Sequence, residues 1–515
     1  MRLGWPLMLV GMIGCGPPDR NGLPDGAATD TPVGSDAPVN ICKVQDDGNA
    51  LPTCTEVAPP GSFTPSIKWT WTGETEPYSI VTPLVANLTD DNGDGAIDLC
   101  DTPDVVVVAS TSSGFPQSEG HIYLLDGKTG AQELMIPTLI DATVTPAIGD
   151  IDGDGVPDIV TVDANGRLYA FDHTGTPIFG PAGQWNAEST TGSVGWYSGA
   201  IALADLDGDG HVEIIGGGTV FDDQGNVLWS VAGDGPWSAT TAADLDGDGK
   251  LEVVLGASAY HYDGSLYWTT DLVPGYPQVA DLDGDGLPEV LLDNQNGLSL
   301  IKHDGTIVYR DLRPTNVGPD GTDWIRPATI HDFMGDGHVE YAMSSASQYT
   351  LYHPDGSIVW TAPVSDESGI AAGTAFDFLG NGSAEAMYAD EEQLFVYDST
   401  GHALLTMPRT SGTLSEYPVV ADIDNDGSAD IIVVSNQSPE GAPASPTVQV
   451  IHDEQDRWIQ ARRIWNEHTY HVTNVREDGT IPAHEVPSWT KLNTFRTNAQ
   501  INGAGVCQPV IGRTL

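Results

Sequence analysis

Residues 150–162 read Asp150-Ile-Asp-Gly-Asp-Gly-Val-Pro-Asp158 followed by Ile159-Val-Thr-Val162, an acidic loop that runs directly into a short apolar stretch. The pattern Asp-x-[Asp/Asn]-x-Asp-Gly-x-x-[Asp/Glu] recurs along the chain, and successive copies start 37 to 60 residues apart. Six complete copies start at Asp90, Asp150, Asp205, Asp244, Asp281 and Asp422, and two degenerate copies start at Asp332 and Asp377. Self-similarity at this spacing indicates a repeat architecture.

Each copy has the same neighbours in the chain. A small or apolar stretch precedes the loop, an apolar run follows it, and a β-hairpin with an Asp/Gly turn comes next, as in Leu351-Tyr-His-Pro-Asp-Gly-Ser-Ile-Val-Trp360. Four short strands per repeat, packed radially, predict an all-β fold, the β-propeller. Eight loops and eight hairpins predict eight four-stranded blades, or seven if one degenerate copy is an insertion.

These repeats resemble FG-GAP repeats, also called VCBS repeats, the units of integrin α-subunit-type propellers in bacterial surface proteins. The resemblance covers about residues 66 to 460. The stretch from Trp458 to Asn474 also resembles a C-terminal module found with such repeats. We therefore expect a propeller over 61–460 and a short irregular C-terminal module over 461–515 that packs on the propeller or closes it.

The composition agrees with many short strands and turns, because Gly (60) and Pro (36) are plentiful and only 18% of the 515 residues are charged. The 73 Asp and Glu against 19 Lys and Arg give a formal charge of -54. A chain this acidic repels nucleic acid and anionic lipid, so neither is an expected partner. The charge also favours a bound hard cation, although the acidic surface of a halophile is an alternative reading.

The repeated loop has the composition of a calcium site, because calcium takes six to eight oxygen ligands at loose geometry. Acids at the first, third and fifth positions alternate, Gly at the sixth allows a sharp turn, and an acid at the ninth closes the shell. About six calcium ions are expected. The predicted ligands are Asp90, Asn92, Asp94 and Asp98; Asp150, Asp152, Asp154 and Asp158; Asp205, Asp207, Asp209 and Glu213; Asp244, Asp246, Asp248 and Glu252; Asp281, Asp283, Asp285 and Glu289; Asp422, Asp424, Asp426 and Asp430.

The alternative for these loops is turn chemistry without metal, since Asp and Gly favour tight turns in any case. The two degenerate copies are expected to keep the turn and bind no ion. In one of them Met334 replaces the third acid, and in the other Leu379 and Asn381 replace the third and fifth acids.

The N-terminus reads as an export signal. Arg2 precedes an apolar run from Leu3 to Ile13, and Met12-Ile13-Gly14-Cys15 resembles a bacterial lipobox, which implies lipidation of Cys15. An ordinary signal peptide is the alternative. Gly16 after the cysteine favours the outer membrane, so we expect an outer-membrane lipoprotein that faces the periplasm or the cell surface. Residues 16 to 60, rich in Pro, Gly, Asp and Thr, predict a flexible tether.

The four remaining cysteines, Cys42, Cys54, Cys100 and Cys507, suggest two disulfides in an exported chain. Four cysteines allow three pairings. The short separation of Cys42 and Cys54 favours pairing these two locally, which leaves Cys100 with Cys507 as a clasp across the ring.

The sequence contains no recognisable catalytic motif. His468, His471 and the nearby His484-Glu485 have a spacing that can ligate zinc, but packing is the simpler reading. Four tryptophans can either stack on sugars or peptides or fill the gaps between blades: Trp185, Trp196, Trp237 and Trp324.

The leading hypothesis is a monomeric, non-enzymatic adhesion or binding module for an unknown protein or glycan, with contact to the membrane only through the lipid anchor. The alternatives are a calcium-dependent polysaccharide lyase or other carbohydrate-active enzyme, and a purely structural surface scaffold.

Overall fold

The computed structural model describes residues 42, 51–112, 119–185, 199–231, 239–313, 326–345, 347–366, 371–437, 445–502 and 505–512. The expected signal peptide, Cys15 and most of the expected tether lie outside the described residues, as do Trp196, Trp237 and Trp324. Within the described residues, no helix is long and apolar enough to cross a membrane.

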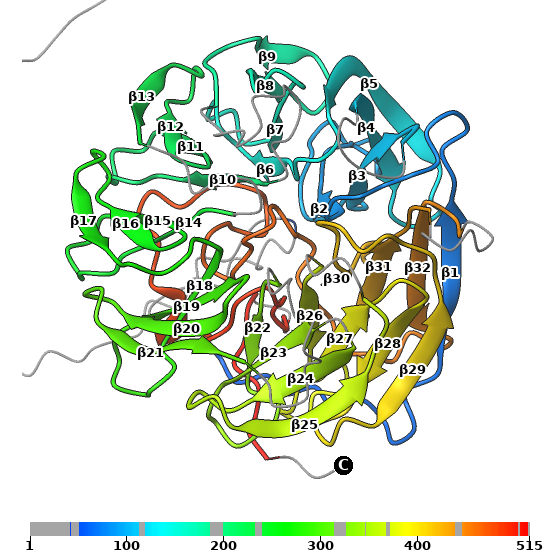
Figure 1. Ribbon diagram of the computed structural model, residues 1–515. Coiled ribbons are helices and arrows are strands. Elements are labelled where there is room, and N and C mark those ends of the chain that lie inside the picture. The colour runs from blue at the N-terminus through cyan, green and yellow to red at the C-terminus, as the bar shows by residue number, and fades with distance from the viewer. Residues whose placement is uncertain are drawn as a thin grey trace, which may run out of the picture. The chain divides into compact units, whose positions relative to one another are not determined.

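Eight four-stranded antiparallel sheets stand around a common axis (Figure 1). Blade 1 is β2 (Leu84–Ala86), β3 (Asp104–Ser110), β4 (Glu119–Asp126) and β5 (Gln132–Asp141). Blade 2 is β6 (Ala147–Gly149), β7 (Asp158–Val162), β8 (Leu168–Phe171) and β9 (Pro177–Phe179). Blade 3 is β10 (Ile201–Ala204), β11 (Glu213–Gly216), β12 (Thr219–Phe221) and β13 (Val227–Ser230). Blade 4 is β14 (Thr241–Ala243), β15 (Glu252–Leu255), β16 (Ser258–Tyr260) and β17 (Leu266–Thr269).

The second half of the ring repeats this arrangement. Blade 5 is β18 (Tyr276–Ala280), β19 (Glu289–Asn294), β20 (Gly297–Lys302) and β21 (Ile307–Leu312). Blade 6 is β22 (Thr329–His331), β23 (Glu340–Ser345), β24 (Gln348–Tyr352) and β25 (Ile358–Pro363). Blade 7 is β26 (Gly373–Phe376), β27 (Glu385–Ala389), β28 (Gln393–Tyr397) and β29 (Ala403–Pro408). Blade 8 is β30 (Val419–Ala421), β31 (Asp430–Val434), β32 (Val448–Asp453) and β1 (Pro65–Trp71). The prediction of eight blades is confirmed, and seven is wrong: both degenerate copies belong to complete blades.

The two inner strands of each blade carry the core. The first strands of successive blades contact one another from β2 through to β30. The second strands are buried along nearly all of their length, and β7 and β31 are also rich in β-branched residues. The fourth strands, in contrast, are partly exposed.

The ring is closed by strands from opposite ends of the propeller. β1 pairs antiparallel with β32, so the first strand in the sequence is the outer strand of the last blade (Figure 1). Trp69 in β1 is 8% exposed, and its indole N–H donates to the carbonyl of Gly127 in blade 1 at 2.7 Å. The closing strand therefore joins blade 8 to blade 1.

The C-terminal module runs inside the ring and bonds to every blade (Figure 1). It contains no strand in its described residues, and its one helical turn is η1 (Ser488–Thr490). Its hydrogen bonds join Trp465 to Val85, Asn466 to Ile148, Glu467 to Leu203, Thr469 to Thr240, Asn493 to Asp281, Phe495 to Ile330, Arg496 to Thr374 and Asn498 to Val420. Each contact falls on or beside the first strand of a different blade, so this segment ties the inner strands together.

Both chain ends of the folded part meet at blade 7. Cys54 and Cys507 form a disulfide with Cα atoms 5.0 Å apart, and the N–H of Ala58 donates to the Leu379 carbonyl at 2.9 Å. The tether expected over 16–60 is therefore wrong for residues 54–58, which lie against the propeller.

The second disulfide joins Cys42 to Cys100, with Cα atoms 4.8 Å apart. All four cysteines are paired as disulfides, but the predicted partners, Cys42 with Cys54 and Cys100 with Cys507, are wrong. The reason is that Cys42 lies at the blade 1 loop whereas Cys54 lies against blade 7, so proximity in sequence does not decide proximity in space.

Adjacent blades interlock through the hairpin turns. Tryptophans in outer strands pack on the turn glycine of the following blade, as Trp229 does on Gly264 and Trp268 on Gly305. Trp185 is 4% exposed and packs on Gly216 and Gly217 of blade 3. For Trp185 the gap-filling reading is therefore confirmed.

Trp69→Ala should lower the free energy of unfolding by about 3 to 5 kcal/mol, because it removes a buried indole that holds the closing strand to blade 1. Ile67→Ala, in the same strand but at a side chain that is 48% exposed, should cost far less. Urea unfolding followed by tryptophan fluorescence measures both. Equal losses would show that Trp69 does not hold the seam.

Candidate metal centres

The repeated acidic loops lie on one face of the ring, because each connects the first strand of a blade to its second. In blade 2 the carboxylate of Asp150 anchors the loop: Oδ1 accepts the N–H of Gly153 at 2.8 Å and Oδ2 that of Gly155 at 3.0 Å. Gly153 and Gly155 have φ of 77° and 90°, values that L side chains rarely adopt. The glycines therefore let the chain wrap around the first aspartate.

The acid that begins each second strand bonds back to the start of its loop. In every blade its carboxylate accepts the N–H of the residue two places beyond the first strand, at 2.7 to 3.3 Å. The pairs are Leu88–Asp104, Ile151–Asp158, Leu206–Glu213, Leu245–Glu252, Leu282–Glu289, Phe333–Glu340, Phe378–Glu385 and Ile423–Asp430. This bond fixes one oxygen and leaves the other oxygen of the carboxylate for a further partner.

The oxygens of two loops converge as a cation site requires. One oxygen from each of Asp150, Asp152 and Asp158 lies within 4.8 Å of the others, and the same holds for Asp205, Asp207 and Asp209. Two ligands that each stand about 2.4 Å from a calcium ion are at most about 4.8 Å apart. The geometry of these loops therefore fits a calcium ion.

The ninth-position acids are hard to ionise in the protein alone. Burial, reinforced by the other acids of the loop, raises the pKa of Asp158 to about 7 and that of Glu213 to about 7. A cation among these carboxylates would favour the ionised form and lower the pKa again.

Blade 1 departs from the nonapeptide. Asp104, not Asp98, begins its second strand, and the extra residues leave room for a twelve-residue loop from Asp90 to Asp101. Asp90 accepts the N–H groups of Gly93 and Gly95, as in the other loops.

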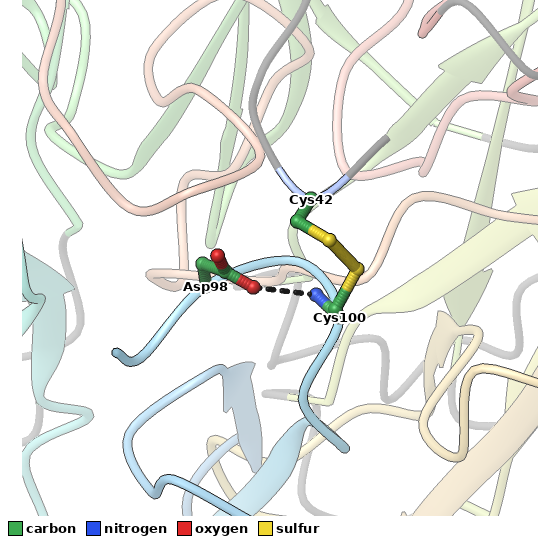
Figure 2. Close-up of side chains that lie close together, drawn as sticks. All are labelled: Cys42, Asp98 and Cys100. Carbon is green, nitrogen blue, oxygen red and sulfur yellow. Dashed lines mark hydrogen bonds between the residues drawn. A yellow bond between two sulfur atoms is a disulfide. The ribbon is translucent and has the colours of Figure 1, made fainter. Parts of the chain in front are cut away.

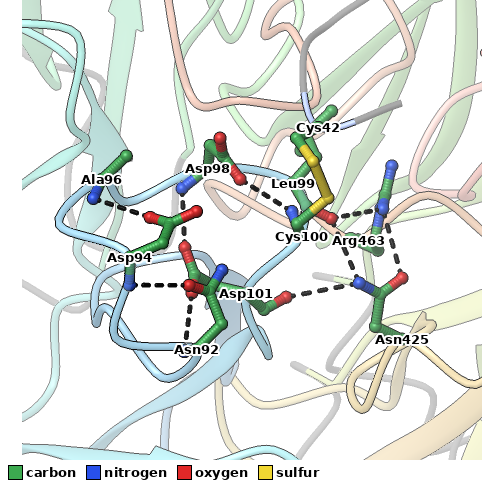
Figure 3. Close-up of a disulfide and its surroundings, with 10 residues drawn as sticks. All are labelled: Cys42, Asn92, Asp94, Ala96, Asp98, Leu99, Cys100, Asp101, Asn425 and Arg463. Atoms are coloured by element: carbon green, nitrogen blue, oxygen red, sulfur yellow. Dashed lines mark hydrogen bonds between the residues drawn. A yellow bond between two sulfur atoms is a disulfide. The ribbon is translucent and has the colours of Figure 1, made fainter. Parts of the chain in front are cut away.

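Asp101 closes this longer loop. It is 1% exposed, and its two oxygens accept the N–H groups of Asn92 at 3.1 Å and Asp98 at 2.9 Å (Figure 3). Acids or amides at the first, third and fifth positions, Gly at the sixth and an acid at the twelfth form the pattern of an EF-hand loop. The sequence analysis missed Asp101, although the spacing of twelve was a signal that could have found it.

The blade 1 loop is held from outside by a disulfide. Cys100, the residue before Asp101, is bonded to Cys42, and its N–H donates to Asp98 Oδ1 at 2.9 Å (Figure 2). Although Asp98 lies beside both sulfurs, the disulfide removes them as metal ligands. Arg463 of the C-terminal module donates to the Leu99 carbonyl at 2.7 Å, which fixes the loop from the other side (Figure 3).

In three of the complete loops a basic side chain reaches the carboxylates. His261 Nδ1 lies 2.9 Å from Glu252 Oε1 in blade 4. Lys302 Nζ lies 2.7 Å from Asp283 in blade 5. In blade 8, Lys68 Nζ contacts three acids: it lies 2.5 Å from Asp424, 3.1 Å from Asp430 and 3.4 Å from Asp426. The sequence analysis missed these residues because each comes from outside its nonapeptide.

The degenerate loops keep the turn, as Asp332 and Asp377 accept the same N–H bonds to Gly337 and Gly382. Blade 7's loop is also covered by protein. A Cβ at Gly382 would lie 2.2 Å from the Val510 carbonyl oxygen. Burial, followed by the charge of Asp377, raises the pKa of Glu385 well above its usual range.

A cavity of about 280 Å³ lies between the two degenerate loops and the C-terminal module. Its walls include the half-buried indole of Trp489 and the side chains of Lys491 and Leu492. His331 and Gln508 also line it. The cavity is lined by aromatic residues, Trp489 and Phe376 among them, and by several polar residues.

The suggested zinc cluster does not form. His471 Nε2 lies 2.8 Å from Glu485, and its Nδ1 lies 3.0 Å from the Thr469 carbonyl. His468 instead packs between the rings of Tyr276 and Tyr417. These histidines help to build the inner module, as the packing reading predicts.

Comparison with known proteins supports the repeat assignment. An FG-GAP-like repeat model matches residues 150–216, and an FG-GAP repeat model matches residues 236–267. No curated protein matches the chain.

Several solved structures share the fold. The Vibrio cholerae biofilm matrix protein Bap1 has a TM-score of 0.75 and 21% identity, covering 88% of this chain and 100% of that chain. The rhamnogalacturonan lyase YesW has a TM-score of 0.50 and 17% identity, covering 87% and 83%. A quinohemoprotein alcohol dehydrogenase from Comamonas testosteroni has a TM-score of 0.50 and 13% identity, covering 78% of each chain.

In EDTA the protein should lose stability as the pH rises from about 4 to about 7. The pKa values of Asp158, Glu213 and Glu252 are about 7 in the folded protein, above the unfolded values of about 4. The folded state therefore holds more protons in that window, so raising the pH favours unfolding. The melting temperature in EDTA at pH 7.5 should be at least about 2 °C below that at pH 5. A melting temperature that rises over this range would contradict the assignment.

Proposed function

Because the chain is an FG-GAP repeat β-propeller, we propose that it is a calcium-binding module of the cell envelope that binds a protein or glycan ligand without catalysing a reaction. The observation that carries the calcium proposal is the convergence of carboxylate oxygens in the loops of blades 2 and 3. Calcium bound there would neutralise acids that otherwise repel one another.

In blade 1 the ligands are Asp90, Asn92, Asp94 and Asp101, with Asp98 at the position that often acts through a water molecule in such loops. The disulfide and Arg463 hold the backbone of this loop, so less order has to be gained when an ion binds. We therefore expect this loop to be one of the tighter sites.

The ligand site is best placed at the cavity between blades 6 and 7. Sugars stack on aromatic faces and hydrogen-bond to polar side chains, and Trp489 and Lys491 offer both kinds of contact. The two loops beside the cavity are the ones whose third position is apolar, so this region of the face is free to recognise a ligand instead of a metal.

An exported location is consistent with two disulfides. The lipobox at Cys15 supports anchoring in the outer membrane, and the likeness to a biofilm matrix protein supports a role at the cell surface. Replacing Cys15 with Ser should then release the chain from the membrane fraction.

Calcium should raise the melting temperature, and EDTA should reverse this, because an ion that binds only the folded state stabilises it by mass action. At a calcium concentration 100 times the dissociation constant, each site adds about 2.7 kcal/mol. Asp152→Asn should remove one bound ion and reduce the calcium-dependent shift. Asp271→Asn, which removes an acid paired with Arg310 outside the loops, should leave the shift unchanged. A melting temperature that does not change when calcium is added or removed would refute the calcium proposal.

Glycan arrays and acidic polysaccharides should reveal binding that Trp489→Ala weakens about tenfold, because a stacked aromatic contact contributes about 0.5 to 1.5 kcal/mol beyond its buried area and about 1.4 kcal/mol is tenfold in affinity. Trp229→Ala, a tryptophan at a blade contact, serves as the control and should leave binding intact. The same incubations test the lyase alternative, which the likeness to YesW favours. Steady formation of unsaturated products, followed by ultraviolet absorbance, would replace the binding proposal with an enzymatic one.

A further inference from the structure

In the blade 8 loop a lysine stands among the acids and its side chain is largely buried, unlike that of Lys302 in blade 5. Lys68 Nζ lies 2.5 Å from Asp424 Oδ2, 3.1 Å from Asp430 Oδ1 and 3.4 Å from Asp426 Oδ2. These are the third, ninth and fifth positions of the loop, the same positions that would surround a bound ion.

Lys68 belongs to the closing strand β1, which positions its side chain among the acids of the blade 8 loop. In the pairing of β1 with β32, Ile67 stands opposite Ile451 and Trp69 opposite Val450, so Lys68 is the extra residue of a β-bulge. The buried Trp69 fixes the strand next to it. As a result the Lys68 side chain is only 12% exposed and Asp430 is 1% exposed.

We propose that the ammonium group of Lys68 is the resident cation of the blade 8 loop, so that this loop takes no calcium and the ring seam is held by an ion pair that chelators cannot remove. This proposal replaces the expectation that Asp422, Asp424, Asp426 and Asp430 bind calcium. The number of calcium ions that it predicts rests on the proposed function, in which the other loops bind calcium.

The electrostatics of the site agree with this proposal. Burial opposes the charge on Lys68, but Asp430, Asp424 and Asp426 outweigh burial and raise the pKa of Lys68 above its ordinary value. The ammonium group therefore stays charged throughout the physiological range. A calcium ion would have to expel a buried lysine from three carboxylates and leave it without a partner.

Lys302 in blade 5 also contacts the acids of its loop, but this ion pair is more exposed to solvent than that of Lys68. Its side chain is 33% exposed, and Asp283 and Asp285, which it contacts, are 42% and 44% exposed. Lys302 also lies 3.6 Å from Glu289. An exposed lysine on an open loop can move into solvent when an ion arrives, so the proposal is confined to Lys68.

Ion counting on the folded protein tests the proposal. Calcium bound per chain is measured by equilibrium dialysis and mass spectrometry of the metal. Asp152→Asn in blade 2 should lose one ion, whereas Asp424→Asn in blade 8 should lose none. Lys68→Met, which keeps the aliphatic stem, should gain one ion. Loss of an ion in Asp424→Asn would overturn the proposal, whether or not Lys68→Met folds.

Melting in EDTA provides a test that does not depend on calcium. Lys68→Met leaves the carboxylates of the seam without a cation, so it should melt about 5 °C or more below the parent chain. Lys128→Met, at an exposed lysine in the β4–β5 turn, should melt like the parent. Added calcium should restore Lys68→Met toward the parent value.

The two proposals can fail separately. If the parent and Asp152→Asn both bind no calcium, the calcium proposal fails, and melting in EDTA alone then decides the role of Lys68. Equal melting temperatures for Lys68→Met and Lys128→Met in EDTA would overturn the inference.

Discussion

The pairing of β1 with β32 is the contact on which the rest of the ring depends. Seven blades form from strands that follow one another in the chain, but the eighth needs a strand from the other end of the propeller. An open ring would expose the edge of β32 and the apolar side of blade 1. The seam is accordingly held by Trp69, by Lys68 and by Arg463, which donates to Leu99 of the blade 1 loop and to Asn425 of the blade 8 loop.

We propose that one backbone design of the acidic loops accepts different cations. In all eight blades the loop is held by N–H groups that donate to its carboxylates, and this holds in the degenerate copies too. These hydrogen bonds pair the N–H groups of the turn, but they leave the negative charge of the clustered carboxylates without a cation. In blade 8 Lys68 meets that charge, and in blade 7 burial raises the pKa of Glu385. In blades 2 and 3 the acid oxygens converge, and there we propose that an ion meets the charge.

The sequence predicted the fold because the repeat is local: each loop, strand and hairpin lies within one stretch of chain. It could not predict contacts that depend on closing the ring. Cys42 pairs with Cys100 across the seam rather than with the nearby Cys54, and Lys68 reaches Asp426 across 358 residues. Asp101 was missed for a different reason. Its spacing of twelve from Asp90 is visible in the sequence, but the nonapeptide pattern assigns the closing acid of the loop to Asp98, at the ninth position.

The same closure explains where a ligand can be recognised. The C-terminal module bonds to the first strand of every blade, so the inner strands are already occupied by the chain itself. Both ends of the folded chain then meet at blade 7, where Cys54 and Cys507 are joined and Val510 packs on the loop at Gly382. A loop covered in this way has no need of a metal to order it. The space between Asp332, Asp377 and Trp489 is the cavity in which we place recognition.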